Sequence, residues 1–113
     1  MRAIPKRLLI HNVTLVHPAR KDRWGKEVPG TQTELDHVRL EPSSKIVKDK
    51  DNNEIQLAAA LFFDCKNSRP KGVQFELDDQ VIFNGQKHRL QLIEPLYDGS
   101  RLHHYEMGLV RDA

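Results

Sequence analysis

The chain has little cysteine and no long apolar run. Cys65 is the one cysteine among 113 residues, so no disulfide can form within the chain. No apolar stretch approaches the roughly 18 residues that a membrane-spanning helix needs, and charges interrupt the first ten residues, which argues against a secretory signal. We therefore expect a soluble protein that resides in the cytoplasm after synthesis, with Cys65 packed as a small apolar residue.

Patterns that support catalysis or metal binding are also scarce. The glycines are dispersed, and no serine lies in a nucleophile motif. Neighbouring side chains of a strand point to opposite faces, so we do not expect His103 and His104 to share a metal ion. Asp78 and Asp79 precede a strand and are typical of a solvated turn. The sequence thus predicts no catalytic residue, no metal site and no cofactor, in a protein that is not an enzyme.

Positive charge is concentrated near the N-terminus. The net charge is +2, but residues 1–30 contain seven Lys and Arg against two acidic residues, whereas the remainder contains eleven against fourteen. A basic segment of this kind can contact phosphates or an acidic protein partner.

The strongest local signal is a β-hairpin in residues 81–93. Asn84-Gly85 is flanked by alternating apolar residues, a pattern typical of a two-residue hairpin turn. In that register Phe83 pairs with Gln86, and Val81 with His88. One face of the hairpin then contains Val81, Phe83, His88, Leu90 and Leu92.

Alternating apolar residues predict further strands on either side of this hairpin. They cover residues 8–17, 31–40, 55–65 and 102–110. The polarity changes phase between Leu35 and Val38, which indicates a bulge or bend. In the last strand Tyr105, Met107 and Leu109 point inward. Residues 1–113 are therefore expected to form a single all-β domain, a small barrel or sandwich of five to six mainly antiparallel strands.

Two long polar segments interrupt this pattern. Residues 19–30 are expected to form a basic loop or arm in which Arg20, Lys21, Arg23 and Lys26 surround Trp24. Trp24 is an interface anchor, a stacking platform for nucleic acid, or a buried residue that closes one end of a barrel. Residues 42–53 are expected to form a long loop. Its lysines, Lys45, Lys48 and Lys50, can touch a phosphate backbone, although Asp49 and Asp51 weaken the field.

Five segments, taken in order, resemble a known family. They are residues 4–11, the turn Asp22-Arg23-Trp24-Gly25, residues 38–43, residues 81–85 and residues 102–106. Their order and spacing are similar to those of the minor capsid proteins found in the head-tail connector of siphophages and prophages. The resemblance covers nearly the whole chain.

The resemblance implies a head-closure protein, or stopper. Such proteins are small β-barrels that dock as a ring beneath the portal after packaging, retain the DNA and present a surface to the tail. The implied partners are the portal or adaptor proteins, a tail-completion protein, further copies of this chain and, transiently, packaged double-stranded DNA, with no membrane. The implied location is the head-tail junction of the virion. The loop of residues 42–53 would project into the channel, and the arm around Trp24 would contact neighbouring subunits or connector rings.

A second hypothesis is an independent nucleic-acid-binding barrel of the oligonucleotide-binding type. Trp24, Phe62 or Tyr97 would then supply stacking platforms, without preference for sequence. Binding to single strands that weakens with salt would favour this reading.

Overall fold

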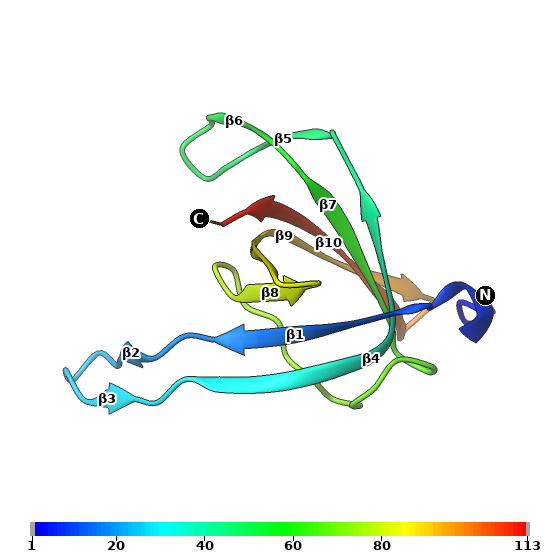
Figure 1. Ribbon diagram of the computed structural model, residues 1–113, viewed down its shortest axis with the longest axis horizontal. Helices are drawn as coiled ribbons and strands as arrows, with labels where there is room; N and C mark the ends of the chain where they lie inside the picture. The colour runs from blue at the N-terminus through cyan, green and yellow to red at the C-terminus, as the bar shows by residue number, and fades with distance from the viewer. Residues whose placement is uncertain (1, 113) are drawn as a thin grey trace.

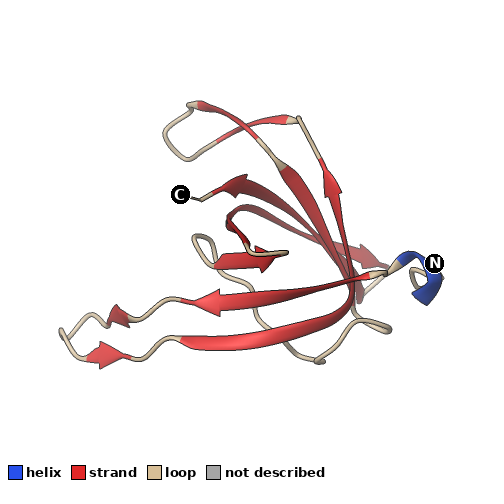
Figure 2. Ribbon diagram, viewed as in Figure 1, coloured by secondary structure: helices blue, strands red, loops and turns tan. Residues whose placement is uncertain are grey.

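The computed structural model describes residues 2–112, and nearly all of its regular structure is β (Figures 1 and 2). No helix among these residues has the length and apolar character needed to cross a membrane. The elements are η1 (Lys6–Leu8), β1 (His11–His17), β2 (Arg20–Lys21), β3 (Glu27–Val28), β4 (Thr31–Pro42), β5 (Ile46–Lys48), β6 (Glu54–Gln56), β7 (Ala59–Asp64), β8 (Gln80–Phe83), β9 (Gln86–Asp98) and β10 (Arg101–Arg111).

Six of the strands form a closed antiparallel barrel in the order β1-β4-β7-β10-β9-β8, with β8 returning to β1. This architecture confirms the predicted all-β barrel. Closure pairs the edge strands, which would otherwise leave backbone N–H and C=O groups open to other chains. The strand expected to begin at residue 8 begins at His11, because residues 6–8 form the short 3-10 turn η1.

The barrel interior is filled by alternate residues of the six strands. Val13 and Leu15 of β1 are buried, whereas Thr14 and Val16 are half-buried, the alternation of a strand with one face inward. Met107 and Leu109 of β10 are also buried. Beside them an aromatic group of Phe63, Phe75 and Tyr105 packs edge to face, a preferred geometry for such rings.

The phase change in β4 is a β-bulge. Val13 pairs with Leu35, but His11 pairs with Val38, so β4 contains an extra residue opposite Asn12. His37 adopts a positive φ of 55° there. The bulge turns both Leu35 and Val38 inward although they are three positions apart, and both are fully buried.

The Asn84-Gly85 hairpin has the predicted register, with Phe83 opposite Gln86 and Val81 opposite His88. The placement of Leu92 on the same inner face as Leu90 is wrong. Between β9 and β10, Leu109 pairs with Leu90 but Gly108 pairs with Leu92, so an extra residue in β9 reverses the alternation. Ile93 packs against the core in place of Leu92.

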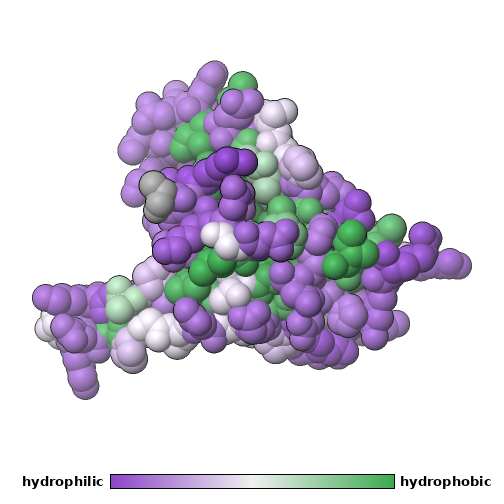
Figure 3. Space-filling model, viewed as in Figure 1, coloured by the Kyte–Doolittle hydropathy of each residue, from purple (hydrophilic) through white to green (hydrophobic). Residues whose placement is uncertain are grey.

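Both long polar segments contain β-structure, where the sequence pattern predicted loops. Residues 19–30 contain the hairpin β2–β3, and residues 42–53 contain β5 and the turn that leads to β6. The predicted strand of residues 55–65 is correspondingly divided into the end of β6 and β7, with a break at Leu57 and Ala58. Both hairpins project away from η1, to the left in Figure 1. Hydrophilic residues cover most of the face seen in Figure 3, and apolar residues show chiefly at its centre, over the barrel.

Candidate interaction surfaces

The two hairpins share the same turn. Asp22 Oδ1 accepts hydrogen bonds from the backbone N–H groups of Trp24 and Lys26, both at 2.9 Å. Asp49 Oδ1 accepts the equivalent bonds from Asp51 and Asn53, again at 2.9 Å. A carboxylate that satisfies the N–H groups following it fixes a turn, so each tip has a defined shape.

The fourth residue of each turn has a left-handed backbone. It is Gly25 with φ of 79° in the first hairpin and Asn52 with φ of 64° in the second. Glycine and asparagine adopt this conformation most readily. The shared spacing of aspartate and Gly or Asn is therefore a signal from which both hairpins could have been predicted.

Two polar contacts fasten the first hairpin to the barrel. Arg20 Nη1 lies 2.9 Å from Glu76 Oε2, and His17 Nδ1 lies 2.8 Å from Asp79 Oδ2. Asp79 is buried and also accepts the backbone N–H of Glu76 at 2.9 Å. The expectation of a solvated turn is therefore wrong for Asp79, because the return of the chain before β8 brings it against the end of β1.

These residues include a group with metal-ligand chemistry that sequence spacing did not indicate. Ligand atoms of His17, Glu76 and Asp79 all lie within 4.8 Å of one another. Each is already engaged: Asp79 accepts from His17 and from a backbone N–H, and Glu76 pairs with Arg20. The arrangement therefore accounts for the anchoring of the β2–β3 hairpin without an ion.

Trp24 lies at the tip of this hairpin and is 76% exposed. The alternative in which Trp24 closes one end of the barrel is therefore wrong. The guanidinium carbon of Arg23 stands 4.3 Å from the centre of the indole ring, a cation–π contact. Lys21 and Lys26 are exposed on the same hairpin, whereas Arg20 is held by Glu76. We call this surface the Trp24 hairpin.

The second hairpin carries the three lysines predicted to touch DNA. Lys48 is in β5, Lys50 is in the turn and Lys45 precedes β5, and all three are exposed. Asp49, Asp51 and Glu54 lie among them, so the hairpin has almost no net charge.

An apolar contact outside the barrel holds the base of this second hairpin. Leu57 is buried and lies over Gly108 of β10, beside Leu92. A Cβ on Gly108 would stand 2.7 Å from a methyl group of Leu57, so any larger residue there would displace this side chain.

His103 and His104 contact each other, so the expectation that the rings point apart is wrong. Their Nδ1 atoms are 2.8 Å apart, because the pairing of β10 with β9 shifts register between Leu102 and His104. His103 Nε2 donates to the carbonyl of Arg2 at 2.6 Å. In neutral His103, Nδ1 then accepts from His104. The pair ties the N-terminal segment to β10.

The buried carboxylate of Asp64 makes a second tie to the N-terminal segment. Oδ1 accepts the N–H of Ile4 at 3.0 Å, and Oδ2 accepts the N–H groups of Lys66 and Asn67 at 3.1 and 2.8 Å. Ser68, in the turn after β7, is buried too. It accepts the N–H of Asp64 at 2.9 Å and donates to the carbonyl of His37. Its hydroxyl therefore serves the structure of this turn.

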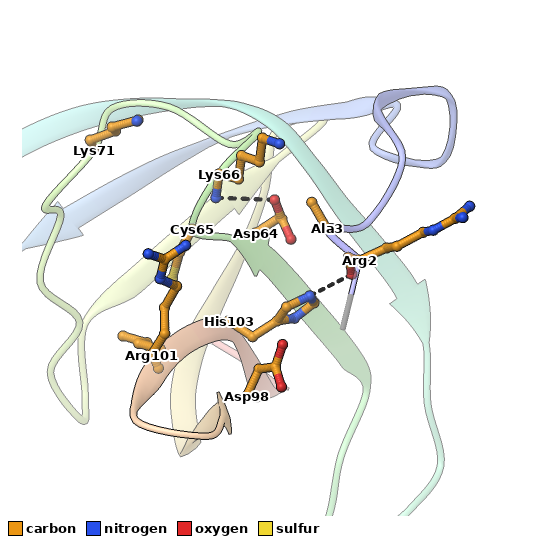
Figure 4. Close-up of a pocket in the computed structure, with 10 residues that line it drawn as sticks. Arg2, Ala3, Asp64, Cys65, Lys66, Lys71, Asp98, Arg101 and His103 are labelled. Carbon is orange, nitrogen blue, oxygen red and sulfur yellow. Dashed lines mark hydrogen bonds between the residues drawn. The ribbon is translucent and has the colours of Figure 1, made fainter.

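A pocket opens beside this cluster (Figure 4). Its walls come from the N-terminal segment, the turn after β7, and the β9–β10 hairpin, and Cys65 lies among them. Burial raises the pKa of the Cys65 thiol, and the negative charge of Asp64 raises it further. Cys65 is half-buried, and both effects favour its neutral thiol over the thiolate.

The fold and these clusters define a class of protein: a small closed β-barrel whose polar groups fix two projecting hairpins and a terminal segment. The profile described as minor capsid protein matches residues 5–109, and the chain belongs to that family. It is therefore a structural component of a phage virion. No curated protein and no solved structure matches the chain.

Proposed function

We propose that the protein is a non-enzymatic part of the head-tail connector, which closes the head after DNA packaging and offers the tail a surface for attachment. Membership of the minor capsid family gives the structural role. The observation that carries the finer proposal is the Trp24 hairpin, a projecting element with an exposed tryptophan at its tip. Tryptophan and arginine are the side chains that most often dominate protein interfaces.

The anchoring of that hairpin supports an interface role. Arg20 and His17 hold its base against Glu76 and Asp79, and the Asp22 turn fixes its tip. A surface that is already ordered loses less conformational entropy on docking. The partners we propose are the portal or adaptor proteins, the tail-completion protein and neighbouring copies of this chain in a ring.

The second hairpin, with Lys45, Lys48 and Lys50, is the element we propose to face the channel. Its lysines can meet DNA phosphates without reading sequence, and the carboxylates among them keep the attraction weak. A weak contact suits a closure that must later release the genome.

Deletion of the gene, followed by negative-stain electron microscopy of the lysate, tests this proposal. We expect heads that have lost their DNA beside complete free tails. Tailed, infectious particles would contradict it.

Complementation of the deletion tests the surface. Trp24→Ala should fail to restore tailed particles, although the purified variant should unfold within about 0.5 kcal/mol of wild type because the side chain is exposed. Tyr97→Ala is the matched control, since Tyr97 is another exposed aromatic, at 58%. Full complementation by Trp24→Ala would contradict the proposed role of the Trp24 hairpin as a docking surface.

A further inference from the structure

The pocket of Figure 4 collects positive charge from three separate segments. Arg2 comes from the N-terminal segment, Lys66 and Lys71 from the turn after β7, and Arg101 from the β9–β10 hairpin. All four side chains are exposed. The sequence positions gave no indication of this cluster, because up to 99 residues separate its members along the chain.

Acidic groups in the same pocket offset this charge only in part. Asp64 is fully buried and its oxygens already accept three backbone N–H groups. Asp98 pairs with Arg101 in the strand register of the β9–β10 hairpin and faces His103 (Figure 4), so its charge offsets part of that of Arg101. Within residues 2–112, no carboxylate forms an ion pair with Lys66, Lys71 or Arg101, whereas Arg20, Arg39 and Arg89 are each paired. The pocket therefore keeps a net positive charge, with four Lys and Arg side chains against two Asp, whereas the lysines of the second hairpin are balanced by acidic residues.

The backbone under these cations is held in place. Asp64 fixes the N–H groups of Lys66 and Asn67, and Arg69 Nη1 donates to the carbonyls of Lys66 and Ser68 at 2.6 and 2.8 Å. The bond from His103 to the carbonyl of Arg2 fixes the remaining segment. Only the side chains need to be ordered when a ligand binds, which lowers the cost of binding.

The lining also points to the class of ligand. Protein interfaces usually have an apolar core, but none of the large apolar side chains that are exposed among residues 2–112 lines this pocket. Its exposed side chains are chiefly Lys and Arg, which are the residues that typically contact the phosphates of a nucleic-acid backbone and position DNA without reading bases.

We propose that this pocket is a binding site for the phosphate groups of duplex DNA. The inference rests on the proposed function, since a head-closure protein meets packaged DNA. It assigns the main phosphate contact to Lys66, Lys71 and Arg101, in the turn after β7 and at the start of β10. The hairpin with Lys45, Lys48 and Lys50 then makes the weaker contact.

Fluorescence anisotropy of the full-length protein with a labelled random-sequence duplex tests the site. The variant Lys66→Ala/Lys71→Ala/Arg101→Ala removes three positive charges, and Lys45→Ala/Lys48→Ala/Lys50→Ala removes three from the hairpin as a matched control. We expect the pocket variant to weaken binding by about tenfold or more and to lower the slope of log K against log salt by about 2 to 3, and the control to change affinity less than about threefold.

Several results would overturn the proposal. They are equal losses in the two variants, a larger loss in the hairpin variant, strong preference for one duplex sequence, tighter binding of an acidic polypeptide than of DNA, and no binding by wild type at low salt. If the pocket variant does not fold, the single changes Lys71→Glu and Lys50→Glu make the same comparison. If the pocket does not bind DNA but deletion of the gene still gives heads that have lost their DNA, only the phosphate-site proposal is wrong and the connector proposal stands. The two proposals can therefore be tested separately.

Discussion

Loss of the Asp64 carboxylate should destabilise the protein more than any other single aspartate change in a turn. Asp64 has no exposed surface, and its two oxygens accept the N–H groups of Ile4, Lys66 and Asn67. In Asp64→Ala these three donors lose their acceptor inside a part-buried site. In Asp64→Asn only one oxygen remains as an acceptor. The new NH₂ group is itself a donor and faces the backbone N–H groups that the second oxygen accepted.

The magnitude follows from the number of bonds. A hydrogen bond to a charged group contributes about 1.5 to 3 kcal/mol, and water can replace part of what is lost at a part-buried site. We therefore expect Asp64→Ala to lower the free energy of unfolding by about 3 to 5 kcal/mol and Asp64→Asn by about half of that. For a domain of this size the melting temperature should fall by about 4 °C for each kcal/mol.

Chemical denaturation and thermal melting measure these changes, and Asp49→Ala is the matched control. Asp49 also accepts two backbone N–H groups, but in an exposed turn, so its removal should cost about 1 kcal/mol. If Asp64→Ala costs no more than Asp49→Ala, the buried carboxylate does not hold the N-terminal segment, and the reasoning fails.

Three further predictions concern single side chains. His88 is buried and its Nδ1 has no hydrogen-bond partner among the described residues, so His88→Leu should raise the melting temperature; a fall of several degrees would show that the imidazole is satisfied after all. Gly108→Ala should cost about 1 to 3 kcal/mol in wild type but little in a Leu57→Ala background, because the new Cβ meets Leu57; equal costs in a double-mutant cycle would refute this contact. The raised pKa of Cys65 means that its thiolate forms at higher pH in the folded than in the unfolded protein. The rate of Cys65 alkylation should therefore rise at higher pH in the folded protein than in denaturant, and identical pH profiles in the two states would contradict the shift. Any stability that the neutral thiol contributes should be lost as pH rises through the pKa of the folded state.

The barrel could be predicted because most of its strands follow simple alternation. The Asn84-Gly85 turn fixed a register, and the phase change between Leu35 and Val38 indicated the bulge that the structure contains. Leu92 shows the limit of such reasoning. A second bulge in β9 lies within a continuous alternating run, and nothing in the local pattern distinguishes it.

Candidate sites were less predictable because they depend on contacts between distant segments. His17 and Asp79 are 62 positions apart, and the cations of the pocket come from three regions of the chain. The contact between His103 and His104 was missed for a different reason. The expectation that neighbours in a strand diverge holds only where the strand is regular, and the register shifts at that point.

The hairpins illustrate an intermediate case. Their composition is polar and contains turn formers, which favoured a reading as loops. The repeated arrangement of Asp with Gly25 or Asn52 three positions later was present in the sequence, but a turn of this kind is recognised only when both copies are compared.

Cryo-electron microscopy of the intact virion tests the connector proposal most directly. We expect a ring of six-stranded barrels between the portal and the tail, with the Trp24 hairpin of each copy seated against a neighbouring protein. Barrel density in the capsid shell or at the distal end of the tail, with none at the head-tail junction, would contradict it.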